Sequence, residues 1–191
     1  MKHDLDARLN KVLDRLLDED FLQGRGLGNE IAFYVFDYPP ESEREVRERI
    51  QALVRDIGRK RPDLRVRHVN LFDLIVDHLR ERGLLDKAIE MQRTKGNDAL
   101  RKALAAPLQA EKLAKVFEQL VEPRSQDLVL LSGIGSAYPM IRSHSLLNNL
   151  HAVMGDKPLV LFFPGSYDGQ SLRLFNKLND ENYYRAFRLV P

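Results

Sequence analysis

The sequence contains no cysteine, which excludes disulfide bonds, thiolate zinc sites and a cysteine nucleophile. No apolar run comes near the roughly 20 residues that a helix needs to cross a bilayer. Basic and acidic side chains number 30 and 28, so no strong net charge points to a nucleic acid or an anionic membrane. The first residues, MKHDLDARLNKVLDRLL, carry too many charges for a signal peptide. We therefore expect a soluble, cytoplasmic protein that does not act on membranes.

The chain is long enough to bury one substantial core: it has 191 residues, of which 43% are hydrophobic. We predict a single α/β domain over residues 1–191. Apolar residues at helical spacing predict an amphipathic N-terminal helix over about residues 3–20. A second helical stretch over about residues 71–120, interrupted by Pro107, predicts a helical insertion.

Three short apolar runs predict buried strands: EIAFYVFD, DLVLLSG and PLVLFFPG. Two further runs, LRVRHVN and YYRAFRLV, mix charged with apolar residues, which is typical of strands at a sheet edge. Between DLVLLSG and PLVLFFPG we expect a helix that begins near Tyr138 or Pro139.

Because strands alternate with helices, we predict a three-layer α/β fold with a mostly parallel, five-stranded sheet and helices on both faces. The pattern is compatible with a Rossmann-like fold or with a degenerate P-loop-like fold. It does not separate a flavodoxin-like strand order from that of a P-loop core, because both place the second and fifth strands outside.

Ligands of such sheets gather beyond the carboxyl ends of the strands, where this chain carries Asp37, Asn70, residues 132–142 and residues 166–168. Asp37, Arg142 and Asp168 could share one cleft there. The alternative is that these charged groups pair with one another to hold loops in place.

The templates for catalysis and nucleotide binding are incomplete. A Walker A loop needs a lysine after its second glycine, and the stretch from Gly133 contains none. The glycines of GRGLGN precede a strand instead of linking a strand to a helix, so the dinucleotide-binding pattern fails as well. His144 and His151 lie about two helical turns apart, too far to ligate one metal unaided. We expect no catalytic residue, metal or cofactor.

The densest basic cluster is RDIGRKRPDLRVRH, at the predicted carboxyl end of one helix and along an edge strand. Cations are favourable at a helix carboxyl end without any nucleic acid, and no aromatic residues alternate with these. Weak nucleic-acid binding through this cluster remains an alternative, and its candidate residues are Arg59, Lys60, Arg61, Arg65 and Arg67.

Four segments occur in an order that resembles the BrxB family of bacteriophage-exclusion (BREX) systems: NEIAFYVFDYPPESEREVR, GIGSAYPMIRSHSLLNNL, PLVLFFPGSYDGQSLRLF and NYYRAFR. The resemblance extends over nearly the whole chain. It implies a small component of an antiphage defence system that acts beside a large ATPase, an alkaline-phosphatase-like PglZ protein and a DNA methyltransferase. The family has no assigned catalytic residues to carry over.

The resemblance, with the missing templates, favours an adaptor that docks the PglZ-like protein and the ATPase and meets DNA only indirectly or weakly. The positions that match the family motif fall into two groups. Those we expect to bind a partner are Tyr138, Arg142, His144, Tyr167 and Asp168. Those we expect to define the fold are Asp37, Gly133, Gly135, Pro139, Asn148, Pro164, Gly165, Tyr184 and Arg185. A nucleotide-sensing, degenerate P-loop module is the main alternative.

Overall fold

The computed structural model describes residues 2–23, 32–179 and 186–191. The first part of the chain forms α1 (Lys2–Leu16), α2 (Glu19–Leu22), β1 (Phe33–Tyr38), the 3-10 helix η1 (Pro40–Ser42), α3 (Glu43–Lys60), β2 (Val66–Asn70), α4 (Leu71–Glu81) and α5 (Leu85–Leu104). The second part forms α6 (Ala110–Val121), the 3-10 helix η2 (Pro123–Ser125), β3 (Leu128–Ser132), α7 (Ile134–Ala137), α8 (Ser143–Met154), β4 (Leu159–Tyr167), β5 (Leu172–Leu174), β6 (Leu178–Asn179) and β7 (Phe187–Arg188).

Five parallel strands form the sheet in the order β2-β3-β4-β1-β7. The second and the last of these strands, β2 and β7, lie at the two edges, as their mixed sequences predict. The first strand lies beside the fourth and the fifth, which excludes the flavodoxin-like order 2-1-3-4-5. Of the two orders that the sequence leaves open, only the one of a P-loop core remains.

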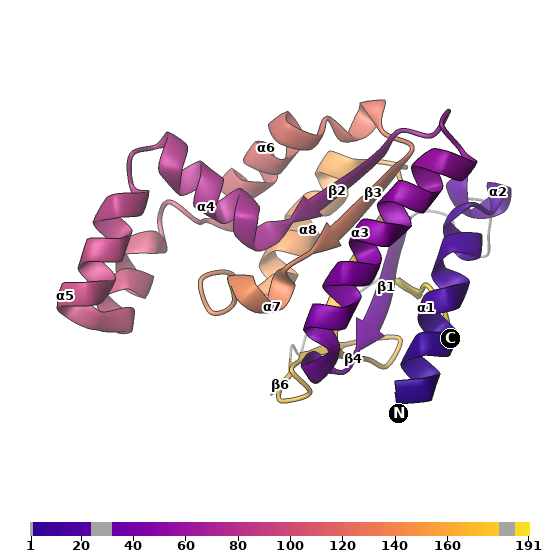
Figure 1. Ribbon diagram of the computed structural model, residues 1–191. Helices are drawn as coiled ribbons and strands as arrows, with labels where there is room; N and C mark the ends of the chain where they lie inside the picture. The colour runs from indigo at the N-terminus through magenta and orange to yellow at the C-terminus, as the bar shows by residue number, and fades with distance from the viewer. Residues whose placement is uncertain (1, 24–31, 180–185) are drawn as a thin grey trace.

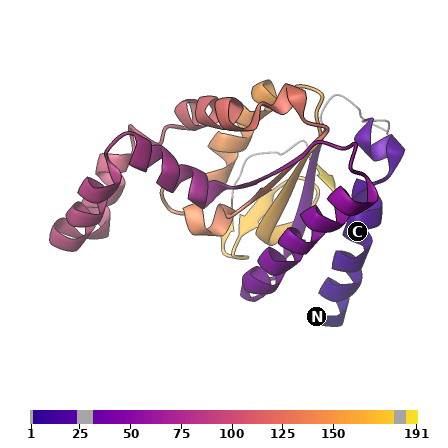
Figure 2. The same cartoon turned by 45° about the horizontal axis from the view of Figure 1, so that its top comes forward.

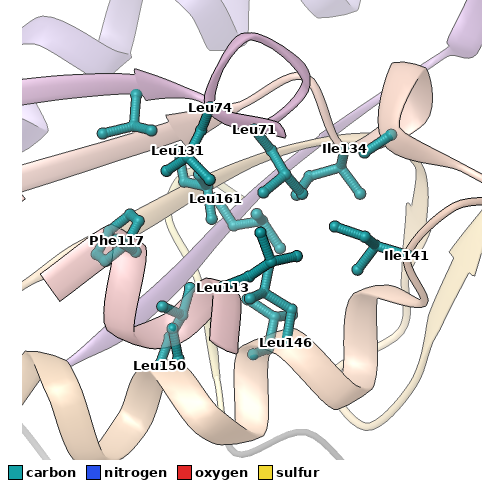
Figure 3. Packing of buried hydrophobic residues seen from close by; sticks show 14 of the residues in the cluster. Leu71, Leu74, Leu113, Phe117, Leu131, Ile134, Ile141, Leu146, Leu150 and Leu161 are labelled. Carbon is teal, nitrogen blue, oxygen red and sulfur yellow. The ribbon is translucent and has the colours of Figure 1, made fainter. Parts of the chain in front are cut away.

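Helices cover both faces of the sheet, so the predicted three-layer α/β fold is confirmed (Figure 1). Side chains along each central strand alternate between the two faces, as strand geometry requires. Val129 and Leu131 of β3 pack with α4, α6, α7 and α8, whereas Leu128 and Leu130 pack with α1 and α3. Figure 3 shows the first of these two cores, in which leucines of α4, α6 and α8 meet Leu131 and Leu161 of the sheet.

The amphipathic N-terminal helix covers the sheet on the same face as α3 (Figures 1 and 2). Its apolar stripe, Leu5, Leu9, Val12 and Leu16, is buried against that face. A helix of 15 residues is marginal by itself in water, so burial of this stripe, at roughly 1.5–3 kcal/mol for each large side chain, stabilises it. The stripe thus serves the core.

The predicted helical insertion consists of α4, α5 and α6, and Pro107 lies in the turn between α5 and α6. Both views show α5 away from the sheet (Figures 1 and 2). Gly96 divides α5, because its backbone has a φ of 79° and a ψ of 178°, outside the helical range. Its positive φ is one that glycine adopts without steric cost.

Two features differ from the sequence-based expectation. The helix expected to begin near Tyr138 or Pro139 begins at Ser143, and a separate four-residue helix, α7, precedes it. Tyr138 is extended, with a ψ of 140°, because a residue before proline is sterically disfavoured in the α region. In addition, β4 continues beyond the expected strand and pairs antiparallel with β5, which pairs with β6.

Candidate functional site

Asp37, at the carboxyl end of β1, is buried in a cluster that we call the Asp37 latch. Its members are Asp37, Arg8, Tyr167 and the more exposed Arg188. The guanidinium of Arg8 donates from Nη2 to Asp37 Oδ1 at 2.7 Å and from Nη1 to the Asp37 carbonyl oxygen at 2.8 Å. The backbone N–H of Tyr167 donates to Asp37 Oδ2 at 3.0 Å. Arg188 lies 4.0 Å from the same oxygen and donates to the Tyr167 carbonyl. The latch therefore ties α1, β1, β4 and β7 together.

The latch also fixes the position of α1 over the sheet. Arg8 lies above the ring of Phe36, with 4.8 Å between the guanidinium carbon and the ring centroid, and it donates to the Val190 carbonyl at 3.3 Å. Both carboxylate oxygens of Asp37 thus accept hydrogen bonds from the fold itself. Asp37 is only 8% exposed, so its carboxylate is held inside the fold and does not face solvent.

Asp168 lies in a turn of its own, beyond the end of β4. Its carboxylate accepts hydrogen bonds from the backbone N–H groups of Gln170 and Ser171, at 2.9 and 2.8 Å, and from the Ser171 hydroxyl. Hydrogen bonds from Ser171 and Gln170 lower the pKa of this exposed carboxyl to about 2. Asp37 pairs with Arg8 and Asp168 binds its own loop. Within the described residues no hydrogen bond or ion pair joins either carboxylate to Arg142, so the shared cleft stays a prediction.

The connection between α7 and α8 lies beside the β5–β6 hairpin and forms an exposed surface. We call it the Tyr138 edge and define it as Tyr138, Arg142, Phe175, Lys177 and Leu178. Tyr138 is 40% exposed, and its ring meets that of Phe175 edge-on, with 6.2 Å between the centroids. Leu178 is 37% exposed. Arg142 and Lys177 are exposed, and neither forms an ion pair within the described residues. This edge therefore combines an aromatic surface with two unpaired cations.

Close contacts explain why glycine stands at two positions beneath this edge. A side chain at Gly135 would meet the ring of Phe175 at 2.9 Å and the buried Pro164 at 3.0 Å. A Cβ at Gly165 would lie 2.1 Å from the carbonyl oxygen of Arg173. Both glycines allow α7 and the β5–β6 hairpin to approach the end of β4 closely.

The other residues that the sequence singles out are distributed as follows. Tyr167 is buried and donates its hydroxyl to the Ala186 carbonyl at 2.7 Å, so it belongs to the latch. Pro139 and Asn148 are exposed. The side chain of His144, and the whole of Tyr184 and Arg185, lie outside the described residues.

The structure brings together one pair of polar side chains, His68 and Ser132, that the sequence analysis did not predict to be neighbours. His68 Nε2 and Ser132 Oγ lie 2.8 Å apart at the carboxyl ends of β2 and β3. Burial lowers the pKa of His68, and Ser132 is only 4% exposed. The pairing of adjacent parallel strands is the signal that could have placed the two together. Because the hydroxyl is buried, the pair joins two strands and offers no accessible nucleophile.

The turn between β1 and α3 is where a P-loop core would hold phosphate groups. This turn contains Pro39 and Pro40, and Glu41, Glu43 and Glu45 follow it. It has neither the glycines nor the lysine of a phosphate-binding loop. Proline has no N–H to donate, and carboxylates repel phosphate, so this turn is unsuited to a nucleotide.

The basic cluster is partly paired with acidic side chains. Arg61 contacts Glu19 and Asp63, each at 2.8 Å. The other two pairs are Arg65 with Asp127 at 3.1 Å and Arg59 with Asp56 at 3.5 Å. Lys60 and Arg67 are exposed, and no ion pair joins either to another described residue. Arg55, the first residue of the cluster, is exposed and also forms no ion pair with a described residue. Three such cations make a weak electrostatic footprint for a nucleic acid.

No helix in the described part of the chain is both long and apolar enough to span a membrane. Over the same residues, no group of three or more histidine, aspartate or glutamate side chains could hold a metal ion.

These features define a three-layer α/β protein with the strand order of a P-loop core and without its phosphate-binding loop. A family model described as "BREX protein BrxB" matches residues 67–189. The BREX protein BrxB of Escherichia coli O9:H4 (strain HS) is 40% identical over 187 residues, which cover 98% of this chain and 92% of that protein. The BREX protein BrxB of Bacillus cereus (strain H3081.97) is 41% identical over 190 residues, or 97% of each chain.

The chain therefore belongs to the BrxB family, as its four motif segments predict. No solved structure matches it.

Proposed function

We propose that this member of the BrxB family acts in BREX antiphage defence as a non-catalytic adaptor. Its partners would be the PglZ-like protein and, through a further contact, the large ATPase of the same system. The Tyr138 edge is the observation that carries the proposal, and it is the surface that we assign to the PglZ-like protein.

The Tyr138 edge has the composition of a protein interface. Tyrosine and arginine are enriched among the residues that dominate binding energy, because they combine large contact area with hydrogen bonding. Tyr138 and Arg142 are exposed although both lie in a motif segment of the family. Neither side chain is needed to fill the core or to pair a buried charge.

The strand ends support a non-catalytic role. The strongest candidate for a general base, Asp37, is held by Arg8 and Tyr167, and Asp168 is held by its own turn. The turn that would cradle a nucleotide carries prolines and glutamates. A cleft with convergent, accessible polar groups is the usual sign of an active site, and these groups are instead occupied by the fold.

Co-expression with the neighbouring PglZ-like protein and ATPase tests the proposal. Size-exclusion chromatography with light scattering, at two salt concentrations, would measure whether the proteins elute together and in what stoichiometry. We expect wild type to co-elute with the PglZ-like protein and Tyr138→Ala/Arg142→Ala to lose it. The matched control is Ile89→Ala/Arg82→Ala, which removes an exposed apolar residue and an exposed arginine from the helical insertion.

Separation of wild type from both proteins at both salt concentrations would contradict the adaptor. So would turnover of a nucleotide, DNA or phosphoester by the purified chain, if one substitution at the carboxyl ends of the strands abolished it.

A further inference from the structure

Helices α1 and α3 lie side by side on the face of the sheet opposite α7 (Figure 1). Two cavities lie between these helices, and we call them together the groove. Its first part is a cavity of about 530 Å³ at the start of α3, bordered by Leu5, Pro39, Ser42, Glu41 and Glu45. Its second part is a cavity of about 140 Å³ further along the same two helices. Apolar side chains such as Leu9, Leu13, Leu53 and Phe162 make up most of its lining, and the polar lining residues are Asn10, Arg49 and Asp56. The two cavities share no lining residue, so the groove consists of a carboxylate-rich cavity and a second, mostly apolar cavity along the same pair of helices.

The carboxylate-rich cavity carries uncompensated negative charge. Glu48 pairs with Arg44 at 3.1 Å, and Glu43 pairs with Arg47 at 3.2 Å and accepts a hydrogen bond from Tyr38. Glu41 and Glu45 form no ion pair with another described residue. Glu45 lies in the first turn of α3 and Glu41 lies just before it, and the dipole of α3 favours carboxylates at this end.

The groove is held in shape from both sides. Arg8 clamps α1 to β1 through Asp37, and Arg49 of α3 donates to Asn10 Oδ1 of α1 across the groove at 2.9 Å. Phe162, at 1% exposed, closes its floor from the sheet. A groove that is already ordered loses little conformational entropy when a partner binds, which favours binding.

We propose that this groove is a second docking surface, and that it binds a segment of a partner protein with basic side chains beside an apolar anchor. The apolar anchor enters the cavity at Leu13 and Leu53, and the basic side chains reach Glu41 and Glu45. Charge complementarity selects this occupant, because carboxylates beside an apolar floor repel phosphates and attract lysine or arginine. An adaptor needs two separate surfaces, and the groove lies across the sheet from the Tyr138 edge.

The test uses the full chain, tagged and co-expressed with the PglZ-like protein and the ATPase. We compare retention of each protein on wild type, on Glu41→Lys/Glu45→Lys and on Glu81→Lys/Glu118→Lys. The last is a matched charge reversal of two exposed glutamates on the helical insertion. Thermal unfolding of each variant establishes that it is folded.

We expect Glu41→Lys/Glu45→Lys to retain about tenfold less of one partner, since like charges then face each other across the interface. The other partner, held at the Tyr138 edge, should be retained, and the control should retain both. If the folded groove variant retains both proteins at wild-type levels, the groove proposal is overturned and the adaptor proposal stands.

If wild type retains neither protein, the adaptor proposal fails and the retention experiment does not test the groove. A second measurement then tests the groove by itself. Photo-crosslinking from p-benzoylphenylalanine in place of Ser42, in cells that carry the whole defence system, reports directly on the groove. An adduct whose crosslinked peptide is rich in lysine or arginine, and which Glu41→Lys/Glu45→Lys removes, supports the groove. No adduct, or one that survives the charge reversal, overturns it.

Discussion

Two regions of this molecule carry residues of the same family motif at the same edge of the sheet, and they use them in opposite ways. In the Asp37 latch the central ion pair is buried: the side chains of Arg8 and Asp37 are 14% and 11% exposed, whereas that of Arg188 is 42% exposed. At the Tyr138 edge the aromatic ring and the guanidinium of Arg142 are exposed, and Arg142 has no ion-pair partner among the described residues. The comparison separates motif residues that hold the fold from motif residues that remain free to contact another protein.

The largest expected effect on stability comes from breaking the latch. Arg8→Ala leaves the Asp37 carboxylate buried without its main counter-ion, and we expect the free energy of unfolding to fall by about 3–5 kcal/mol. Urea unfolding followed by circular dichroism measures it. The double variant Arg8→Met/Asp37→Leu removes both charges and should recover most of the loss. A loss below about 1 kcal/mol for Arg8→Ala would show that the latch does not hold α1.

A smaller loss is expected where the parallel strands β2 and β3 end side by side. Gly133 has a φ of 76°, and a Cβ there would lie 2.0 Å from Asn70 Oδ1, the group that caps the first turn of α4. We expect Gly133→Ala to cost about 2–4 kcal/mol, from left-handed strain and displacement of the cap. Gly83→Ala is the control, because Gly83 also has a positive φ, of 63°, at the end of α4 but has open space around it. It should cost about 1–2 kcal/mol, and an equal loss at both positions would contradict the role of Asn70.

The next effect depends on pH. The ring of His151 stacks on that of Phe33, with 3.8 Å between the centroids, and burial lowers the pKa of His151. In the unfolded chain the pKa is about 6.5. Just below that pH, the unfolded chain therefore binds a proton at His151 while the folded chain keeps the imidazole neutral. The unfolded state then holds more protons, and stability falls as the pH drops below about 6.5. His151→Phe preserves the stack and should reduce the fall in Tm between about pH 7.5 and 5.5. An unchanged pH dependence would contradict this contribution.

The smallest effect on stability is expected at the Tyr138 edge. Tyr138→Ala and Arg142→Ala each remove an exposed side chain, so the free energy of unfolding should change by less than about 0.5 kcal/mol for each. Chemical denaturation of the two single variants measures it. A loss of about 3 kcal/mol at Arg142 would place this residue in the fold, together with the latch.

Much of the fold follows from the sequence because burial leaves a pattern. Runs such as LVLL and LVLFF are apolar on both faces and predict central strands, and charges within LRVRHVN predict an edge. The order of the strands in the sheet cannot be predicted from the sequence, because the sequence of a crossover helix does not show beside which strand the next strand will pair. The β5–β6 hairpin was also missed, since its strands have three and two residues, too few to show alternation.

The sequence predicts which site residues lie at the ends of strands, but it does not predict their contacts with residues far away in the chain. Asp37 was expected at a carboxyl end, whereas its partner Arg8 lies 29 residues earlier on a helix rich in charges. Arg8 shares a helical face with Leu5, Leu9 and Val12, and a charge within an apolar stripe is the signal that could have marked it. Exposure of Tyr138 and Arg142 depends on how α7 packs on the hairpin, which only the tertiary structure shows.

The central claim is that the Tyr138 edge serves association and not folding. Biolayer interferometry of the purified PglZ-like protein against wild type and Tyr138→Ala/Arg142→Ala, with the Tm of each chain measured in parallel, tests it most directly. We predict binding at least about tenfold weaker for the variant at an unchanged Tm, since such residues often dominate interface energies. Equal affinity for both chains, or unfolding of the variant, would contradict the claim.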